Sequence, residues 1–287
     1  MPRDNTFPGK IASQADQLKM DSDLALLENA LWETASPAAM DPAFRTSLRA
    51  ALLSAPAPTL YAPMDTPLGH IWVAYREDVI RYVSSMDEQS FLARAREILD
   101  EPLFREEQPP TAVMRRVVAA IEGRRPLPEQ VDLSTVTPFQ RAVLEATLRI
   151  PRGEVRSYAW IARELGRPRA VRAVGTALAR NPIQYVIPCH RVIRSGGDLG
   201  NYSGGGVVTK ERALQYEGVD LRRLRDLAQR GLRFQGNSRT KSFCLPTCSS
   251  LKHASEKTAV FFHSENEALH AGFHPCELCR PVASVSA

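Results

Sequence analysis

The sequence has few cysteines and no long apolar run. Its 287 residues include only five cysteines, and no stretch approaches the roughly 20 apolar residues needed to cross a bilayer. The first residues, Met1–Thr6, lack the apolar core of a secretory signal. These absences argue against a membrane-spanning protein and against a disulfide-rich secreted one. We therefore expect a cytoplasmic chain whose thiols stay reduced.

Positive charge is unevenly distributed along the chain. The formal net charge is +5, but Thr137–Thr240 alone contains 19 Arg and Lys against 8 Asp and Glu, a net charge of +11. The remaining residues are therefore acidic overall. A basic central region indicates a polyanionic partner, most simply nucleic acid, with a solvated Arg-rich surface as the alternative.

Two patterns precede the basic region. Residues 1–57 show helical spacing of apolar residues and are expected to form a helical extension. Residues 58–135 begin with alternating apolar residues and continue with helical spacing, which predicts an α+β unit. This unit has no cysteine and no obvious cluster of ionisable residues, so we interpret it as scaffold. The expected elements are helices at Asp23–Trp32 and about Phe44–Leu53, a hairpin turning at Arg76–Asp78, and helices at Asp87–Asp100 and from a Thr111 cap to Gly123.

The basic region opens with helix signals. Thr137–Gln140 reads Thr-Pro-Phe-Gln, which combines a capping box with proline at the first helical position. Ser157 can cap a short helix, and a second helix is expected over about Arg169–Arg180 after a turn at Gly166. Two short helices around a glycine turn predict a helix-turn-helix, by itself a weak indication of DNA binding. Four arginines in and just before the second helix strengthen it: Arg167, Arg169, Arg172 and Arg180.

Cys189 is the best candidate for a nucleophile. It stands between Pro188 and His190, and the apolar run Tyr185–Ile187 predicts a short buried strand that the proline ends. A free thiol has a pKa of about 8.5 and needs a base or a positive neighbour to react at neutral pH. Because side chains of adjacent strand residues diverge, we do not expect direct contact between Cys189 and His190. Taken alone, the motif also fits a thiol hydrolase.

The other four cysteines form two close pairs near the C-terminus. They read Cys244-x3-Cys248 and, after 27 residues, Cys276-x2-Cys279. Such pairs predict one zinc ion held by four thiolates. A site of this kind supplies an apparent binding free energy of about 10 to 16 kcal/mol, enough to fold a tail with a sparse core. The rival ligands, expected at the surface, are His253, His263, His270 and His274.

The central motifs resemble those of the O6-alkylguanine-DNA alkyltransferases. The resemblance covers roughly Thr59–Gly218. The motifs that carry it are Gly153–Tyr158, Asn181-Pro182, Pro188-Cys189-His190-Arg191-Val192 and Gly200–Gly205. It implies a methylated-DNA–protein-cysteine methyltransferase that acts once, moving the alkyl group of O6-alkylguanine in double-stranded DNA irreversibly to Cys189. The implied fold class is α+β, with a small ribonuclease-H-like N-terminal unit and a mainly helical, winged-helix-like helix-turn-helix domain.

The resemblance assigns the catalytic roles. It implies that His190 acts on Cys189 through a water and is oriented by Glu217, a relay of nucleophile, base and orienting acid. Tyr158 would share a proton with the departing guanine. Lys210 would lie near the same site, and Asn181 would support the loop that carries the nucleophile. The implied catalytic set is Cys189, His190, Glu217, Tyr158, Asn181 and Lys210.

The resemblance also implies how DNA is bound. The target base must be flipped out of the duplex, and Arg172 would fill the gap that it leaves. The recognition helix would enter the minor groove, where small residues permit close approach. Tyr202 and Ser203 would form the wall and lid of the base pocket. The implied contact residues are Arg172, Tyr202, Ser203, Arg191, Ala170, Ala173, Gly175 and Ser157.

The cysteine-rich tail resembles the metal-binding module of Ada-type adaptive-response proteins, although it follows the alkyltransferase part instead of preceding it. The resemblance implies that Cys244 both binds zinc and accepts a methyl group from DNA methylphosphotriesters. A monomer is expected. The expected domains are a helical extension (1–57), a scaffold (58–135), the alkyltransferase domain (136–220), a basic linker (221–239) and the zinc module (240–287).

Two alternatives remain open. The first is a DNA-binding sensor of alkylation damage whose zinc module serves docking or regulation and not repair. A sensor that holds the lesion without repairing it would lack an acceptor cysteine, and Cys189 is present. The second is a stress-sensing protein in which the zinc tail dominates.

Overall fold

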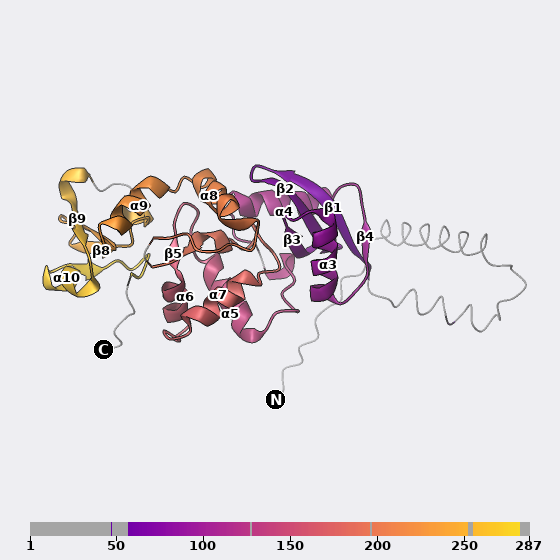
Figure 1. The fold of residues 1–287 in the computed structure, drawn as a ribbon, viewed down its shortest axis with the longest axis horizontal. Helices are drawn as coiled ribbons and strands as arrows, with labels where there is room; N and C mark the ends of the chain where they lie inside the picture. The colour runs from indigo at the N-terminus through magenta and orange to yellow at the C-terminus, as the bar shows by residue number, and fades with distance from the viewer. Residues whose placement is uncertain (1–46, 48–56, 127, 196, 252–254, 282–287) are drawn as a thin grey trace, which may run out of the picture. The chain divides into compact units, whose positions relative to one another are not determined.

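The computed structural model describes residues 47, 57–126, 128–195, 197–251 and 255–281 (Figure 1). Both helices expected in the first 57 residues lie outside this range, except for Ser47, which is helical. Helices and sheets are mixed along the described part, so the α+β class is confirmed. No helix in that part combines the length and the apolar character needed to cross a membrane.

The first sheet has four strands in the order β3-β2-β1-β4. Their bounds are β1 (Thr59–Thr66), β2 (Gly69–Arg76), β3 (Val79–Ser84) and β4 (Leu103–Arg105). The expected hairpin is confirmed as the antiparallel pair β2 and β3, whose turn places Glu77 at a φ of 51°. Alternation along β2 sends Trp72 to one face and Val73 to the other, so each face has its own core.

Two helices pack against this sheet. Helix α3 (Glu88–Leu99) buries Phe91 with Trp72, and α4 (Thr111–Ile121) buries residues in the core of the opposite face. Asp87 caps α3 by accepting a hydrogen bond from the Ser90 amide at 2.9 Å. Thr111 is the first residue of α4 and not its cap, because Pro110 occupies the cap position.

The scaffold contains a partly buried ionic cluster, contrary to the sequence-based expectation. Arg81, which is 8% exposed, pairs with Glu101 and, at 3.0 Å, with Asp132. Arg76 also reaches Glu101, at 2.5 Å. These residues are separated by 20 to 51 positions in the sequence, so only the sheet brings them together. The cluster links β2 and β3 to the segments that follow them.

The basic region folds into helices that contact one another (Figure 1). Thr137 caps α5 as predicted, accepting from the Gln140 amide at 3.2 Å. The Gln140 side chain does not complete the capping box; it donates to the Arg180 carbonyl at 2.8 Å and so ties the start of α5 to the end of α7. The helices are α5 (Pro138–Leu148), α6 (Tyr158–Glu164), α7 (Val171–Ala179), α8 (Gly206–Tyr216) and α9 (Leu221–Gln229).

The strand predicted at Tyr185–Ile187 is wrong. Tyr185 has a φ of 67°, and the Ile187 amide donates to the Ile183 carbonyl at 2.9 Å. Local hydrogen bonds of this kind close a turn and leave no ladder for a neighbouring strand. Cys189 therefore begins a 3-10 turn, Cys189–Arg191, which leads into β6 (Val192–Ile193) paired with β5 (Arg156–Ser157).

The segment expected to be a linker contains a helix and a strand. It contains α9, whose leucines are buried, and β7 (Phe234–Asn237), which is an inner strand of the second sheet. That sheet has the order β10-β8-β7-β9, and its other strands are β8 (Ser242–Cys244), β9 (Ala259–Phe262) and β10 (His274–Pro275). Phe243, Phe262 and Phe273 form its core beside α10 (Glu265–His270).

Candidate functional site

Cys189 lies at the base of a hollow between α7 and the segment 200–203. Its side chain is buried, with 5% of the residue exposed. Asn181 fixes the nucleophile loop by donating to the Ile187 carbonyl at 3.0 Å and to Cys189 Sγ at 3.2 Å. Burial raises the pKa of the Cys189 thiol despite that hydrogen bond. The resting group is therefore a thiol, and a base must remove its proton before it attacks.

His190 is held in place by Glu217. Its Nε2 lies 2.7 Å from Glu217 Oε1, so the proton is assigned to Nε2. The opposite nitrogen, Nδ1, is buried and has no hydrogen-bond partner within the described residues. Burial lowers the pKa of His190, which keeps the ring neutral and Nδ1 able to accept a proton. No direct hydrogen bond between the side chains of Cys189 and His190 occurs among the described residues, in line with their divergence on a tight turn.

Arg191, which the resemblance placed among the DNA-contacting residues, is buried. It is 4% exposed, and its Nε and Nη2 donate to Glu217 at 2.9 Å while Nη1 donates to the Ile150 carbonyl at 2.7 Å. Burial opposes the ionisation of Glu217, but His190 and Arg191 outweigh it and lower the pKa of that carboxyl to about 2. Arg191 thus keeps a buried carboxylate charged beside His190.

Three further predicted residues meet at the hollow. Lys210 is buried, donates to the carbonyls of Val192 and Leu199 at 2.6 Å each, and lies 5.9 Å from the ring centres of Tyr158 and Tyr202. Burial lowers the pKa of Lys210 to about 8. Burial and the nearby Cys189 raise the pKa of Tyr158, so its hydroxyl keeps its proton at neutral pH.

The residues predicted to contact DNA differ in exposure. Arg172 is exposed and lines the hollow, and Ala173 beside it on α7 is also exposed. Ala170 and Gly175 are half-buried. A Cβ on Gly175 would lie 4.0 Å from the Tyr158 ring, which is ordinary contact. Further hollow-lining residues from the predicted set are Tyr202 and Ser203.

Ser157 has a structural use. Its hydroxyl accepts from the Trp160 amide at 3.1 Å and so caps α6, as the sequence predicts. This bond fixes the start of the helix that carries Tyr158 at its first position. The Tyr202 hydroxyl, by contrast, is buried in the hollow beside the Cys189 thiol, and burial raises the pKa of Tyr202.

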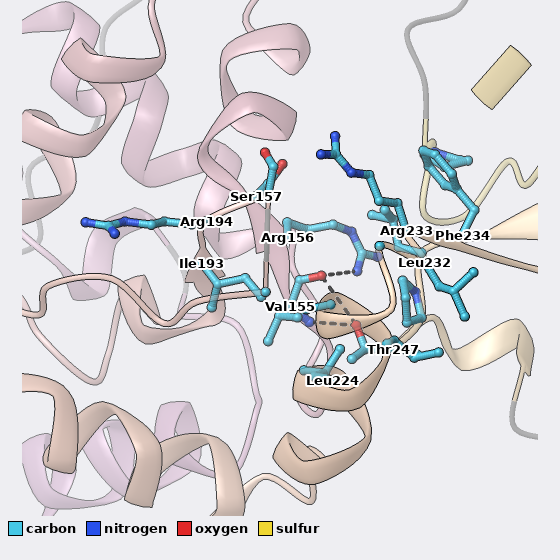
Figure 2. Close-up of a pocket in the computed structure, with 18 of the residues that line it drawn as sticks. Val155, Arg156, Ser157, Ile193, Arg194, Leu224, Leu232, Arg233, Phe234 and Thr247 are labelled. Atoms are coloured by element: carbon cyan, nitrogen blue, oxygen red, sulfur yellow. Dashed lines mark hydrogen bonds between the residues drawn. The ribbon is translucent and has the colours of Figure 1, made fainter. Parts of the chain in front are cut away.

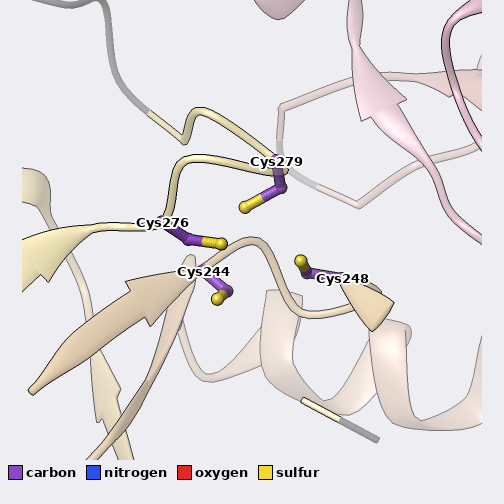
Figure 3. A group of neighbouring side chains, drawn as sticks. All are labelled: Cys244, Cys248, Cys276 and Cys279. Atoms are coloured by element: carbon purple, nitrogen blue, oxygen red, sulfur yellow. The ribbon is translucent and has the colours of Figure 1, made fainter. Parts of the chain in front are cut away.

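The four C-terminal cysteines converge on one point (Figure 3). Their sulfur atoms all lie within 4.8 Å of one another, and all four side chains are buried. Four thiolate sulfurs at about 2.3 Å from a tetrahedral zinc ion would lie about 3.8 Å from one another, so the donor set fits zinc. The Leu245 amide also points at Cys279 Sγ, at 3.4 Å. His263, His270 and His274 are exposed, as predicted, and His253 lies outside the described residues.

Sequence reasoning missed the contacts between this metal site and the helical domain. Trp160 Nε1 donates to the Cys279 carbonyl at 2.9 Å, and the Ser249 amide donates to Glu154 Oε1 at 2.9 Å. The Val155 amide donates to the Thr247 hydroxyl at 3.0 Å. More than 90 positions separate the partners in each case, and no local sequence signal marks them.

Fold and site together place a buried cysteine next to a hydrogen-bonded His–Glu pair and near an arginine-bearing helix, and they add a separate cluster of four cysteines that fits zinc. Residues 138–219 match the family model described as "6-O-methylguanine DNA methyltransferase, DNA binding domain". Residues 220–282 match the "Metal binding domain of Ada".

Curated relatives agree with this class. The chain is 36% identical over 159 residues to the methylated-DNA–protein-cysteine methyltransferase of Methanosarcina acetivorans, covering 55% of this chain and 97% of the relative. It is 36% identical over 163 residues to that of Salmonella typhimurium, covering 54% and 94%. A solved O6-methylguanine methyltransferase of Mycobacterium tuberculosis is 32% identical, with a TM-score of 0.47 and coverage of 55% and 92%. The chain belongs to the methylated-DNA–protein-cysteine methyltransferase family.

Proposed function

We propose that this protein repairs DNA by moving the alkyl group of O6-alkylguanine to Sγ of Cys189, once per molecule. The observation that carries the proposal is the position of Cys189. Its thiol lies in a hollow that is also lined by Tyr158 and Lys210, and the exposed side chain of Arg172 lines the same hollow. The buried His190–Glu217 pair supplies the base that a thiol of raised pKa requires.

The proton and the alkyl group move in a fixed order. His190 Nδ1 accepts the thiol proton through a bridging water, and the ionised Glu217 stabilises the imidazolium that forms. The thiolate then attacks the alkyl carbon, so that an S–C bond forms while the C–O6 bond breaks and its electron pair passes to guanine. Tyr158 donates a proton to the departing base, and the nearby charge of Lys210 stabilises the tyrosinate. No group in the hollow can cleave the resulting thioether, so the protein is consumed.

DNA presents the base through flipping. The exposed Arg172 would fill the gap in the duplex, and the small residues Ala170, Ala173 and Gly175 would let α7 approach a minor groove. Tyr202 and Ser203 would close on the base. The pairing of α6 and α7 around Gly166 supports a helix-turn-helix of winged-helix type, and the four-stranded sheet supports a ribonuclease-H-like N-terminal unit.

The zinc site would be held by Cys244, Cys248, Cys276 and Cys279. Bound zinc would fix the fold of the tail and lower the pKa values of the thiols that hold it. Cys244 is a candidate second acceptor, toward methylphosphotriesters, as the match to the Ada metal-binding domain supports. The alternative is a module that docks or regulates without repair, and the contacts of Trp160 and Glu154 with the module favour it.

The chain organisation is part of the proposal. We assign a scaffold (58–135) and the alkyltransferase domain (136–220), and we keep the helical extension (1–57) as an expectation that lies almost entirely outside the described residues. The expected linker (221–239) is divided: Leu221 and Leu224 of α9 pack in one core cluster with Leu214 of α8, and β7 joins the sheet of the zinc module. The protein would act as a monomer. A DNA substrate and thiols that must stay reduced support a cytoplasmic, nucleoid-associated location.

Intact-protein mass spectrometry tests the proposal. The zinc-loaded protein is exposed separately to O6-methylguanine duplex, to methylphosphotriester duplex and to undamaged duplex. We expect one added methyl group with the first, located at Cys189 by peptide mapping, and none with the third. Methyl transfer that persists in Cys189→Ala would refute the assignment of the nucleophile. A methyl group from the second duplex at Cys244 would favour dual repair over a docking module.

A further inference from the structure

A second hollow lies where the helical domain meets the zinc module, and we call it the junction pocket (Figure 2). It has a volume of about 220 Å³. Its walls come from the Arg156–Ser157 strand, from α9 and from the turn between Cys244 and Cys248. Four arginines line it, and its described lining residues include no Asp or Glu.

The pocket is held in shape by buried hydrogen bonds. Glu154, 3% exposed, accepts from the Ser249 amide, and Val155 exchanges hydrogen bonds with Thr247. Trp160, also 3% exposed, donates to the Cys279 carbonyl. Because these bonds join both sides of the pocket, its walls do not have to be ordered when a ligand binds.

The charges of the pocket are only partly neutralised. Arg156 pairs with Glu154 at 2.5 Å, yet its Nε is buried and has no hydrogen-bond partner in the described part of the chain. Arg163 donates to the Pro281 carbonyl at 3.0 Å and lies near Glu164 and Glu265. Arg194 and Arg233 also line the pocket, and among the described residues their guanidinium groups form no hydrogen bond or ion pair. Arg233 is therefore left with a positive charge that a ligand of the pocket can neutralise, whereas the guanidinium of Arg194 is directed away from the other arginines (Figure 2).

Arg194 connects the pocket to the hollow that holds Cys189. It lines both, and its Nε lies 3.6 Å from the Cβ position of Gly200 in the wall of that hollow. In Figure 2 the guanidinium of Arg194 points away from those of Arg156 and Arg233. A strand bound at the hollow can thus pass Arg194 and reach the pocket without crossing an acidic residue of either lining.

We propose that the junction pocket binds a backbone phosphate of the same DNA duplex, beyond the flipped nucleotide. Its volume is below the roughly 300 to 1,000 Å³ of typical small-molecule sites, which suits one phosphodiester group better than a whole nucleotide. Arginine forks match phosphate oxygens, and Leu224, Leu227 and Leu232 offer an apolar wall to the adjoining deoxyribose. The inference rests on the proposed function, since it takes the duplex as the ligand of the main hollow.

The zinc module thereby becomes part of the DNA-binding surface. Leu245, Pro246 and Thr247, which line the pocket, stand between two metal-binding cysteines. The module would lengthen the contact with DNA and position the duplex relative to Cys189, whether or not Cys244 accepts a methyl group.

The test compares Arg233→Gln with a matched control in the full-length, zinc-loaded protein. Arg233 is exposed, lines the pocket and is not part of the catalytic set. The control, Arg230→Gln, removes an arginine from the same segment that pairs with Asp226 and does not line the pocket. Binding to an undamaged duplex is measured by fluorescence anisotropy from low to moderate salt, and methyl transfer is measured at saturating lesion duplex.

We expect Arg233→Gln to weaken duplex binding about fivefold to tenfold and to reduce the slope of log affinity against log salt by about 1. Arg230→Gln should do neither, and Arg233→Lys should retain the slope because it retains the charge. Transfer at saturating duplex should stay unchanged. A wild-type protein that binds duplex but transfers no methyl group would overturn the proposed function. The comparison of duplex binding between Arg233→Gln and Arg230→Gln would still be valid, because it does not depend on methyl transfer.

Inorganic phosphate and a deoxynucleoside monophosphate are the competing ligands. If either binds to the wild-type protein and loses affinity in Arg233→Gln while the duplex affinity and salt slope of that variant match the control, the pocket is a small-anion site and the proposal is overturned. The proposal also fails if Arg233→Gln and Arg230→Gln reduce the slope equally, since the charge of Arg233 then acts only through the general field.

Discussion

Replacing Glu217 by glutamine should test the central ion pair most directly. The Glu217 carboxylate contacts His190 Nε2 at 2.7 Å and Arg191 through two nitrogens at 2.9 Å, and its side chain is only 2% exposed. Glutamine keeps the shape and can still accept the His190 proton. It cannot neutralise Arg191, whose charge would remain buried without a counter-ion.

The magnitude follows from the pKa of Glu217. Its fall from an ordinary 4.5 to about 2 corresponds to about 3 kcal/mol of differential stabilisation at neutral pH. Removing one partner of a buried ion pair costs about 3 to 5 kcal/mol in other proteins, which agrees. We therefore expect Glu217→Gln to lower the free energy of unfolding by about 3 kcal/mol at pH 7. Methyl transfer should slow as well, because the imidazolium of His190 loses its counter-charge.

Denaturant unfolding at several pH values measures the predicted loss in the free energy of unfolding and its pH dependence. The folded-state pKa of Glu217 is depressed, so its contribution is complete above about pH 4.5 and is lost as pH falls toward 2. The wild-type protein should lose this stability on acidification, and Glu217→Gln should lack that part of the pH dependence. Glu211→Gln is the control, since Glu211 pairs at the surface with Arg225, 51% exposed, and should change stability by at most about 1 kcal/mol. A loss below about 1 kcal/mol in Glu217→Gln would refute the reasoning.

Three further outcomes follow from the structure. Asn181→Ala should destabilise the fold by about 1 to 3 kcal/mol and slow methyl transfer, because it frees the nucleophile loop at two points; denaturant unfolding and single-turnover kinetics measure both, and an unchanged rate would contradict the role of Asn181. The transfer rate should fall as pH rises through about 8, because Lys210 then loses the proton whose charge stabilises the tyrosinate. The rate is measured against pH for the wild-type protein and for Lys210→Met, and the same fall in both would exclude Lys210 as the cause. Trp160→Phe should release zinc to a chelator faster than Trp72→Phe, because only Trp160 donates to the metal loop, and equal release would contradict a coupled junction.

Local features of the fold could be predicted from the sequence because their physics is local. Thr137 and Ser157 cap their helices with hydrogen bonds to amides three residues ahead, and such bonds need no tertiary context. The two cysteine pairs have the spacing that a thiolate site needs, so Cys244 and Cys279 could be placed together before any fold was known. The alternation in β2 likewise identified its partner.

Features that depend on distant parts of the chain could not be predicted. A buried apolar run such as Tyr185–Ile187 fits a strand or a turn equally well, and only backbone hydrogen bonds decide between them. β7 is only four residues long, and its two buried positions are a glutamine and a glycine, so no apolar alternation marks it and its segment was expected to be a linker. Arg191 stands in a basic region, which suggested DNA contact, and its burial follows from a carboxylate 26 positions away.

The placement of Arg191 also explains why the nucleophile motif has an arginine after the histidine. A neutral His190 needs a charged carboxylate beside it, but burial alone would raise the pKa of Glu217 and favour its neutral form. Arg191 supplies the charge that keeps Glu217 ionised. The three residues therefore act as one unit in which Arg191 fixes the charge state, Glu217 fixes the tautomer and His190 accepts the proton. A double variant, Glu217→Gln with Arg191→Met, should accordingly regain part of the stability that Glu217→Gln loses, since it removes the unpaired charge, while methyl transfer should stay slow. Recovery of both quantities together would mean that Glu217 serves stability alone.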